Sequence, residues 1–309
     1  MNGPHLKPIF SKKSNMHNKY SDFIISISFI LLFLLIAIIS INIFTIEESK
    51  IASTNGIVTN IWIHSSKLER LQENKIKYLF VDIGDISPKG EIITPKEEIN
   101  LFLESIKKYE KFNNYNFILL PYTEIILDKY SLNEEFQDNL MQEHKNLINL
   151  GFNGAFIDIE KIPFNKRQDY LNFIEELNKN IPQNSTLAIY SGHLNDKNTN
   201  EWEWNLNLYQ SIASEADIII FPAYDTSIQD KKSYQNQIAE EIKELNKINS
   251  KAKFMLGIPT HKQYLETIEN ALEIYQQEAN QNSNFIGISI FAEWTTDKEE
   301  WNIYRESFN

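Results

Sequence analysis

The sequence contains no cysteine, and this absence excludes several kinds of chemistry. Disulfides, thiolate nucleophiles and cysteine-ligated zinc sites all require that residue. H-E-x-x-H and G-x-S-x-G motifs are also missing, as are the glycine-rich loops that hold phosphates. Zinc peptidases, hydrolases with a nucleophile elbow and nucleotide-binding enzymes therefore have no support. We expect neither a metal nor a cofactor.

Positive charge is scarce as well. The 309 residues include 30 Lys and Arg against 42 Asp and Glu, which gives a formal net charge of -12. A protein that binds nucleic acid needs a surplus of Lys and Arg to meet the phosphates, so we expect no nucleic-acid partner. Hydrophobic residues make up 42% of the chain and charged residues 23%, which is typical of a globular protein.

One long hydrophobic run lies near the N-terminus. Residues 23–46 contain no ionised side chain, and about 20 apolar residues are enough to cross a hydrocarbon core of ~30 Å. Lysines precede the run and two glutamates follow it, so the positive-inside rule predicts a cytoplasmic segment at 1–22. We expect a single-pass membrane anchor at 23–46, a linker at 47–56 and an extracellular domain at 57–309. The alternative is cleavage of the run, although signal peptides have shorter apolar regions.

Beyond residue 56, short apolar runs alternate with longer amphipathic segments. We expect strands at 57–63, 77–82, 117–121, 154–159, 186–190, 217–222, 253–258 and 285–291. We expect helices at 134–150, 166–178, 233–249 and 264–280. Nearly continuous apolar strands are typical of a parallel sheet that is covered on both faces. Eight strands separated by helices favour an α/β fold of the (β/α)8 TIM barrel type over an open doubly wound sheet.

Two acidic residues lie at the end of the fourth expected strand. Side chains alternate along a strand, so Asp158 and Glu160 share one face with Phe156. We expect this face to point toward the barrel axis, while the alternate apolar residues pack against the helices. Active sites in TIM barrels form at the carboxyl ends of the strands, and such surroundings can raise the pKa of a carboxyl group until it serves as a general acid. A structural pair of acids is the alternative.

Other strand ends add aromatic and acidic side chains. Tyr122 follows the third strand, Tyr224 and Asp225 follow the sixth, and Glu293 and Trp294 follow the eighth. A flat aromatic face beside carboxylates suits a sugar ring and its glycosidic oxygen. The combination therefore predicts a carbohydrate site.

These residues give the sequence a resemblance to glycoside hydrolase family 18, the chitinase-like barrels. The fourth-strand motif of that family, D-G-x-D-x-D-x-E, aligns with residues 153–160. Asp158 and Glu160 are retained, whereas Asn153 and Phe156 replace the first two acids. The family's sixth-strand M-x-Y-D, seventh-strand G-x-P and eighth-strand Trp resemble the following parts of this chain: 222–225, 257–259 and Trp294.

The resemblance implies a glycosidase that hydrolyses N-acetylhexosamine-containing glycans. Together with the expected extracellular location, it suggests a cell-wall glycan, a chitin-like polymer or an exopolysaccharide as the substrate. The family's mechanism retains configuration and is assisted by the substrate. Glu160 would protonate the leaving oxygen and then activate water. Asp158 would hold the 2-acetamido group for attack on the anomeric carbon, with Tyr224 bonded to the acetamido oxygen. Asp225 would position the same region, and Trp294 would form the floor of the site.

Four further residues are assigned to substrate binding: Trp62, Tyr122, Glu293 and Asn153. One alternative enzyme would use Asp225 or Glu293 as a nucleophile and would cleave sugars that lack an acetamido group. The alternative from another class is a lectin-like protein that binds glycan without cutting it, because two motif acids are replaced.

Two smaller groups of residues remain open to interpretation. His64, His193 and His261 are expected to be solvated loop residues rather than a cluster at the barrel mouth. Trp202 and Trp204 either extend a sugar cleft or pack a long loop. The Lys- and Glu-rich helices are expected to present solvated faces.

Overall fold

The computed structural model describes residues 54–127, 131–159, 161–195, 197, 200–261, 265–280 and 283–308. All of them belong to one compact unit, Ile51–Asn309. The predicted membrane anchor at 23–46 lies outside the described residues, and so does Glu160. A search of the described helices finds none that combines the length and the apolar character needed to cross a bilayer.

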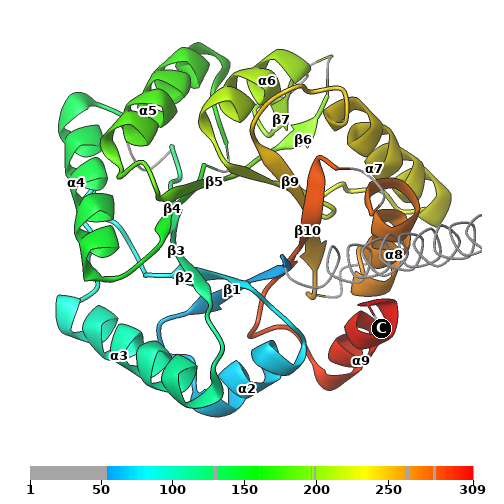
Figure 1. The fold of residues 1–309 in the computed structure, drawn as a ribbon. Helices are drawn as coiled ribbons and strands as arrows, with labels where there is room; N and C mark the ends of the chain where they lie inside the picture. The colour runs from blue at the N-terminus through cyan, green and yellow to red at the C-terminus, as the bar shows by residue number, and fades with distance from the viewer. Residues whose placement is uncertain are drawn as a thin grey trace, which may run out of the picture. The chain divides into compact units, whose positions relative to one another are not determined.

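Eight parallel strands close into a barrel, which Figure 1 shows in a view along its axis. The strands are β1 Gly56–Asn60, β2 Tyr78–Asp82, β3 Ile118–Glu124, β4 Gly154–Asp158, β5 Thr186–Tyr190, β8 Ile218–Pro222, β9 Lys253–Pro259 and β10 Phe285–Phe291. Each predicted strand is present, with ends that differ by no more than about three residues. The TIM-barrel prediction is confirmed.

The ring closes where the first strand pairs with the last. β1 hydrogen-bonds to β2 on one edge and to β10 on the other. Asn55, just before β1, reinforces this junction: its side-chain NH2 group donates to the Tyr304 hydroxyl at 2.7 Å, and its side-chain oxygen accepts the Ile288 N–H at 3.0 Å. The two ends of the unit are therefore joined directly.

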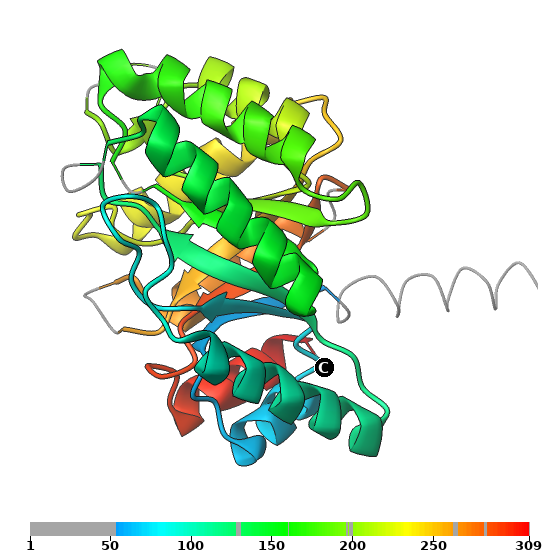
Figure 2. The same cartoon turned by 90° about the vertical axis from the view of Figure 1, so that its left-hand side faces the viewer.

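Helices surround the barrel, as Figures 1 and 2 show from two directions. They are α2 Ser65–Glu73, α3 Lys96–Asn113, α4 Glu134–Leu150, α5 Arg167–Asn180, α6 Leu206–Glu215, α7 Lys231–Leu245, α8 Ile268–Ile274 and α9 Lys298–Phe308. A 3-10 turn, Phe164–Lys166, precedes α5, and a π-helical turn, Tyr275–Ala279, follows α8. α4 has the predicted bounds. α8 begins later than predicted because the Thr267 hydroxyl accepts the N–H of Asn270 and caps the helix there.

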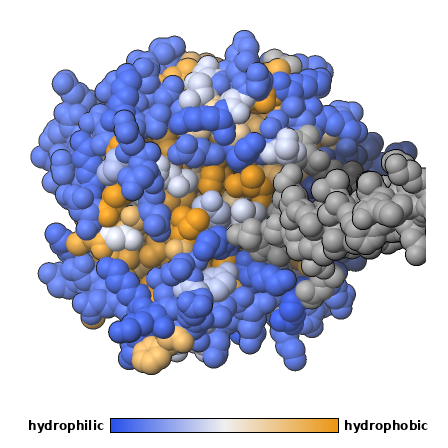
Figure 3. All heavy atoms as spheres, viewed as in Figure 1, coloured by the Kyte–Doolittle hydropathy of each residue, from blue (hydrophilic) through white to orange (hydrophobic). Residues whose placement is uncertain are grey.

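Two apolar layers hold the barrel together. Inside it, Phe156 packs with the inward-facing side chains of the other strands, Phe80 and Leu120 among them. Outside it, Ala155 and Ile157 belong to the larger cluster between strands and helices. The alternation predicted for the fourth strand is confirmed. The face seen in Figure 3 is mostly polar, with apolar residues visible between the polar ones near its middle.

A small second sheet lies between β5 and α6. It pairs β6, His193–Leu194, with β7, Glu203–Trp204. The close approach of the two segments requires glycine at position 192, because a Cβ there would lie 2.1 Å from the Trp202 carbonyl oxygen. This insertion forms one side of the cavity described below.

Two tryptophans of this insertion have different roles. Trp204 is fully buried, and its ring contacts Tyr170 and Tyr209 at centroid distances of 5.8 and 5.3 Å. Trp202 is 51% exposed and lines the cavity. Of the two interpretations of this pair, loop packing therefore holds for Trp204 and cleft lining for Trp202.

Candidate functional site

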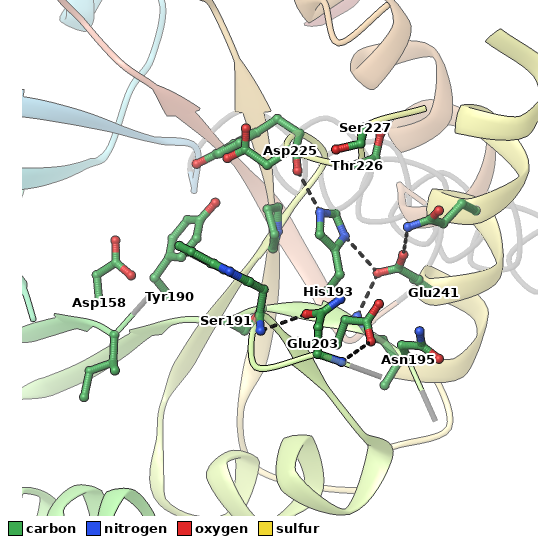
Figure 4. A pocket seen from close by; sticks show the side chains of 18 of the residues that line it. Asp158, Tyr190, Ser191, His193, Asn195, Glu203, Asp225, Thr226, Ser227 and Glu241 are labelled. Atoms are coloured by element: carbon green, nitrogen blue, oxygen red, sulfur yellow. Dashed lines mark hydrogen bonds and ion pairs between the residues drawn. The ribbon is translucent and has the colours of Figure 1, made fainter. Parts of the chain in front are cut away.

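A cavity of about 960 Å³ opens at the carboxyl ends of the barrel strands. Tyr122, Asp158, Tyr190, Tyr224 and Phe291 line it from the barrel. The β6–β7 insertion and α7 line it from the side, as Figure 4 shows for part of the lining. This size and mixture of aromatic and polar groups fit a small-molecule or oligosaccharide site.

Asp158 lies at the end of β4 and is 6% exposed. The Tyr122 hydroxyl, from the neighbouring β3, donates to Asp158 Oδ2 at 2.7 Å. Burial, and then the negative charge of Asp158, raise the pKa of Tyr122 well above its usual value. The phenol therefore remains a proton donor to the carboxylate at neutral pH. The structure brings together these two residues of the predicted site.

An aromatic group adjoins Asp158. Tyr190 lies beside Asp158 in the register of β5 against β4, and its ring centroid is 6.2 Å from that of Tyr224. Tyr224 also stacks on Phe291 at 5.8 Å and meets the edge of His261 at 5.6 Å. Burial, followed by the interaction with Tyr224, raises the pKa of Tyr190 well above its usual value. Flat aromatic rings can pack against the face of a sugar ring, and neutral phenols can form hydrogen bonds to its hydroxyl groups.

Asp225 lies on a loop that Glu266 holds in place. The Glu266 carboxylate accepts the N–H groups of Asp225 and Thr226 and the Thr226 hydroxyl, each at 2.7 Å. Asp225 has a φ of 61°, a left-handed conformation that aspartate tolerates better than most residues. Burial and the charge of Glu266 raise the pKa of Asp225, although the nearby His261 and His193 oppose this. The loop directs a carboxylate into the cavity.

Three residues at this loop have the donor types of a metal site. Asp225, His261 and Glu266 each offer one ligand atom, and these atoms lie within 4.8 Å of one another. Carboxylate and imidazole groups suit several divalent ions. However, both oxygens of Glu266 already accept hydrogen bonds from the loop, and these bonds account for its burial. The absence of a metal stays a prediction.

His193 connects the insertion, α7 and the end of β8. Its Nε2 lies 2.7 Å from the Tyr224 carbonyl oxygen, and its Nδ1 lies 3.3 Å from Glu241 Oε2, as Figure 4 shows. Both partners are acceptors, so a doubly protonated ring satisfies them together. Burial alone lowers the pKa of His193, but the hydrogen bond and charge of Glu241 outweigh it and raise the pKa. The prediction that this residue is a solvated loop histidine is wrong, since its side chain is only 15% exposed.

The raised pKa of His193 predicts a pH-dependent stability. The protonated ring contributes fully below its unfolded pKa of about 6.5, and the contribution disappears as the pH rises through the higher folded pKa. We expect His193→Gln to lower the melting temperature more at about pH 6 than at about pH 9. Thermal unfolding of both proteins across this range measures the difference. If the difference in melting temperature between the two proteins does not change with pH, the ring of His193 is neutral in the folded protein.

Two predicted substrate ligands lie away from the cavity lining. Asn153 precedes β4, at the end opposite Asp158, and its side-chain oxygen accepts the Leu119 N–H at 2.7 Å. It therefore links β3 to β4, and we remove it from the substrate-binding set. Glu293 is 4% exposed and pairs with Lys67 at 2.6 Å. That ion pair occupies the carboxylate that was predicted to face the substrate.

The two remaining predicted tryptophans are exposed. Trp62 is 61% exposed, and its indole N–H donates to Glu98 Oε2 at 3.3 Å rather than lining the cavity. Trp294 is 45% exposed, and its ring meets the edge of Phe291 at 6.2 Å. Since Phe291 lines the cavity, Trp294 lies one ring away from it.

Sequence reasoning missed the acidic side of the cavity. Glu241 is 4% exposed on α7, a helix expected to present a solvated face, and it lines the cavity with Glu240 and Glu244. A signal was present: Glu241 follows Ile238 by three residues and precedes Leu245 by four, so the helical period places it on the buried face.

Comparisons with known proteins identify the fold. No family model and no curated protein matches the chain. The Bacillus cereus spore cortex-lytic enzyme SleL is similar in structure, with a TM-score of 0.63 and 12% identity over 84% of this chain and 75% of that one. A chitinase from Chromobacterium violaceum ATCC 12472 has a TM-score of 0.60 and 11% identity, covering 82% of this chain and 99% of that one. A chitinase from Bacteroides thetaiotaomicron has a TM-score of 0.60 and 12% identity, covering 83% and 96%. The barrel thus shares the chitinase-like fold.

Proposed function

We propose that the protein is a glycoside hydrolase that cleaves N-acetylhexosamine-containing glycans by a retaining, substrate-assisted mechanism. The observation that carries this proposal is the hydrogen-bonded Tyr122–Asp158 pair, which lies in an aromatic cavity at the strand ends. The fold shared with chitinases and with a spore cortex-lytic enzyme supports the substrate class.

The proposed reaction assigns roles to three residues. Asp158 accepts the acetamido N–H, so that the acetamido oxygen attacks the anomeric carbon while the bond to the leaving oxygen breaks. Tyr224 donates to that acetamido oxygen, and Glu160, two residues after Asp158, gives its proton to the leaving oxygen. Glu160 then removes a proton from water, which attacks the same carbon and releases the acetamido group. Configuration is retained because two displacements occur.

The cavity lining leaves Asp225 as the better of the two carboxylates considered as an alternative nucleophile. Glu293 is paired with Lys67 and does not line the cavity, whereas Asp225 does line it. An enzyme that used Asp225 would form a covalent glycosyl intermediate and would need no acetamido group. Cleavage of deacetylated glycans as fast as acetylated ones would favour this reading.

Glycan binding without hydrolysis is the second candidate function, and Phe156 favours it. Its ring is fully buried and lies 4.7 Å from the Phe80 ring and 5.3 Å from the Tyr122 ring. Where the resembled family has an acid that exchanges hydrogen bonds with the residue at the position of Asp158, this chain has a packed apolar ring. A lectin-like protein needs the cavity but does not need that exchange.

The proposed location is the outer face of a cell membrane, with residues 23–46 as the anchor. The uncharged run and the lysines before it support this proposal. An enzyme held there would meet cell-wall glycans or exopolysaccharide first.

Glu160→Gln tests the proposed function. We expect the wild-type chain to release reducing ends from peptidoglycan or chitin oligomers but not from their deacetylated equivalents. Loss of the acid should lower the rate about 10²-fold or more, because glutamine cannot donate the proton. Glu269→Gln is the matched control, since Glu269 is exposed on α8 and does not line the cavity. No cleavage by any form, together with retained binding, would support the glycan-binding alternative.

A further inference from the structure

We propose that the preferred glycan is partly de-N-acetylated, with a cationic glucosamine unit against the acidic wall of the cavity and an N-acetylated unit at Asp158. The acidic wall consists of Glu203 from β7 and Glu240, Glu241 and Glu244 from α7. This inference deepens the proposed function and depends on it.

The charged side chains that line the cavity are predominantly negative. The four carboxylates of the acidic wall lie on the side formed by the insertion and α7, and Asp225 adds a fifth nearby. No Lys or Arg occurs among the described residues that line the cavity. Of the described histidines, only His193 lines the cavity, and it is already paired with Glu241. A cation entering the cavity therefore meets a net negative field.

Two members of the acidic wall remain accessible to a ligand. Glu240 is exposed and has no hydrogen-bond or ion-pair partner within the described part of the chain. Glu244 lies 2.5 Å from Lys247, but the Lys247 side chain is 63% exposed, and surface pairs of this kind contribute little. Both carboxylates can therefore turn toward an ammonium group without breaking a buried contact.

An aromatic face on the same side of the cavity points to a sugar ligand independently of the charges. Trp202 lines the cavity while 51% of its surface remains exposed. Its backbone is fixed, because its N–H donates to Asn200 Oδ1 at 2.9 Å and its carbonyl oxygen packs against Gly192. An indole face stacks on a sugar ring and also attracts a nearby ammonium group. A glucosamine unit offers both features at once.

The two ends of the cavity favour different sugar units. At the barrel end, Asp158 already accepts a hydrogen bond from the Tyr122 hydroxyl. The neighbouring phenols can form hydrogen bonds to a neutral acetamido group. At the acidic wall, a neutral sugar would displace water from carboxylates and return no charge interaction. A protonated amine compensates for that loss through charge-assisted hydrogen bonds. The chain is thus matched to a polymer that carries both kinds of unit.

The test measures binding and cleavage of chitin oligomers of one length that are fully acetylated, half acetylated or fully deacetylated. The full chain carrying Glu160→Gln, in an uncharged detergent, holds the oligomers uncleaved for calorimetry. We expect the half-acetylated oligomer to bind about tenfold tighter than the acetylated one at low salt, and the advantage to shrink in about 0.5 M NaCl. The Glu240→Gln/Glu244→Gln pair should remove the advantage by weakening binding of the half-acetylated oligomer about tenfold, while the acetylated oligomer binds at least as tightly as before, because its neutral sugar no longer displaces water from two carboxylates. Glu269→Gln should leave both affinities as they were.

The outcomes separate this inference from the function on which it rests. Equal, salt-independent affinity for acetylated and half-acetylated oligomers, with acetylated glycan still cleaved by the wild-type chain, would overturn the inference alone. Tightest binding and fastest cleavage of the fully deacetylated oligomer would overturn both the mixed substrate and the assisted mechanism. Failure to bind or cleave any oligomer, together with no release of reducing ends from peptidoglycan, would overturn the proposed function itself.

Discussion

Replacing Asp158 by asparagine is expected to lower kcat on an N-acetylated glycan by about 10²–10³-fold, while the affinity for the glycan changes only a few-fold. Asparagine can still form a hydrogen bond to the acetamido group, but it lacks the charge that stabilises the positive charge developing on that group. Because the charge matters most in the transition state, the loss falls on kcat rather than on binding. Initial rates and calorimetric affinities on one oligomer measure the two quantities separately.

Tyr122→Phe provides a graded comparison for this experiment. It removes the 2.7 Å hydrogen bond to Asp158 and leaves the carboxylate in place. We expect a smaller loss, about 3–10-fold, because one hydrogen bond is typically worth about 0.5–1.5 kcal/mol. Circular dichroism and melting temperature check that both variants fold. Full activity of Asp158→Asn would refute the assisted mechanism and would direct attention to Asp225.

Replacing Phe156 by aspartate, which restores the acid of the resembled family, is expected to destabilise the barrel by about 3–5 kcal/mol or more. The change removes a buried ring that packs between Phe80 and Tyr122, and it leaves a carboxyl group among apolar side chains. Urea unfolding at neutral pH measures the loss. The destabilisation should become smaller as the pH falls, because burial raises a carboxyl pKa and the folded state favours the protonated form.

Phe156→Leu is the control for loss of the ring without an added carboxyl group. Leucine keeps the site apolar, so we expect it to lower the free energy of unfolding by about 2 kcal/mol less than aspartate does, or by a still smaller amount. Near wild-type stability of Phe156→Asp would show that the interior can accept an acid beside Asp158. In that case the variant should also hydrolyse glycan faster, since an acid that can exchange hydrogen bonds with Asp158 would be restored.

Local periodicity was sufficient to predict the barrel and the orientation of its fourth strand. The two-residue alternation placed Asp158 inside and Ile157 outside, and both positions are observed. Tyr122 was also predicted, because it follows a buried strand that neighbours β4. These inferences depend only on the alternation of side chains along a strand, which can be read from the order of residues in the sequence.

Residues whose role depends on distant parts of the chain were harder to predict. Asn153 lies in a motif that suggests catalysis, yet its amide group serves the neighbouring strand. Glu241 lies among lysines and glutamates; the helical period places it on the buried face, but two of the groups that its carboxylate meets there, the His193 ring and the Leu194 N–H, lie 48 and 47 residues earlier. Trp202 and Trp204 are two residues apart with opposite roles, because Tyr170 and Tyr209 approach only one of them. Such contacts are set by tertiary structure rather than by local pattern.

The junction between β1 and β10 determines when the unit can be completed during synthesis. Ile57 pairs with Ile290, and Asn55 donates to Tyr304, so the first strand lacks one neighbour until the ribosome has also made β10. Contacts of such long sequence separation form slowly and leave strand edges open to other chains in the meantime. A nascent chain that ends before residue 285 is therefore an open, association-prone sheet, and the addition of the single strand β10 covers the two open edges that could pair with other copies of the chain.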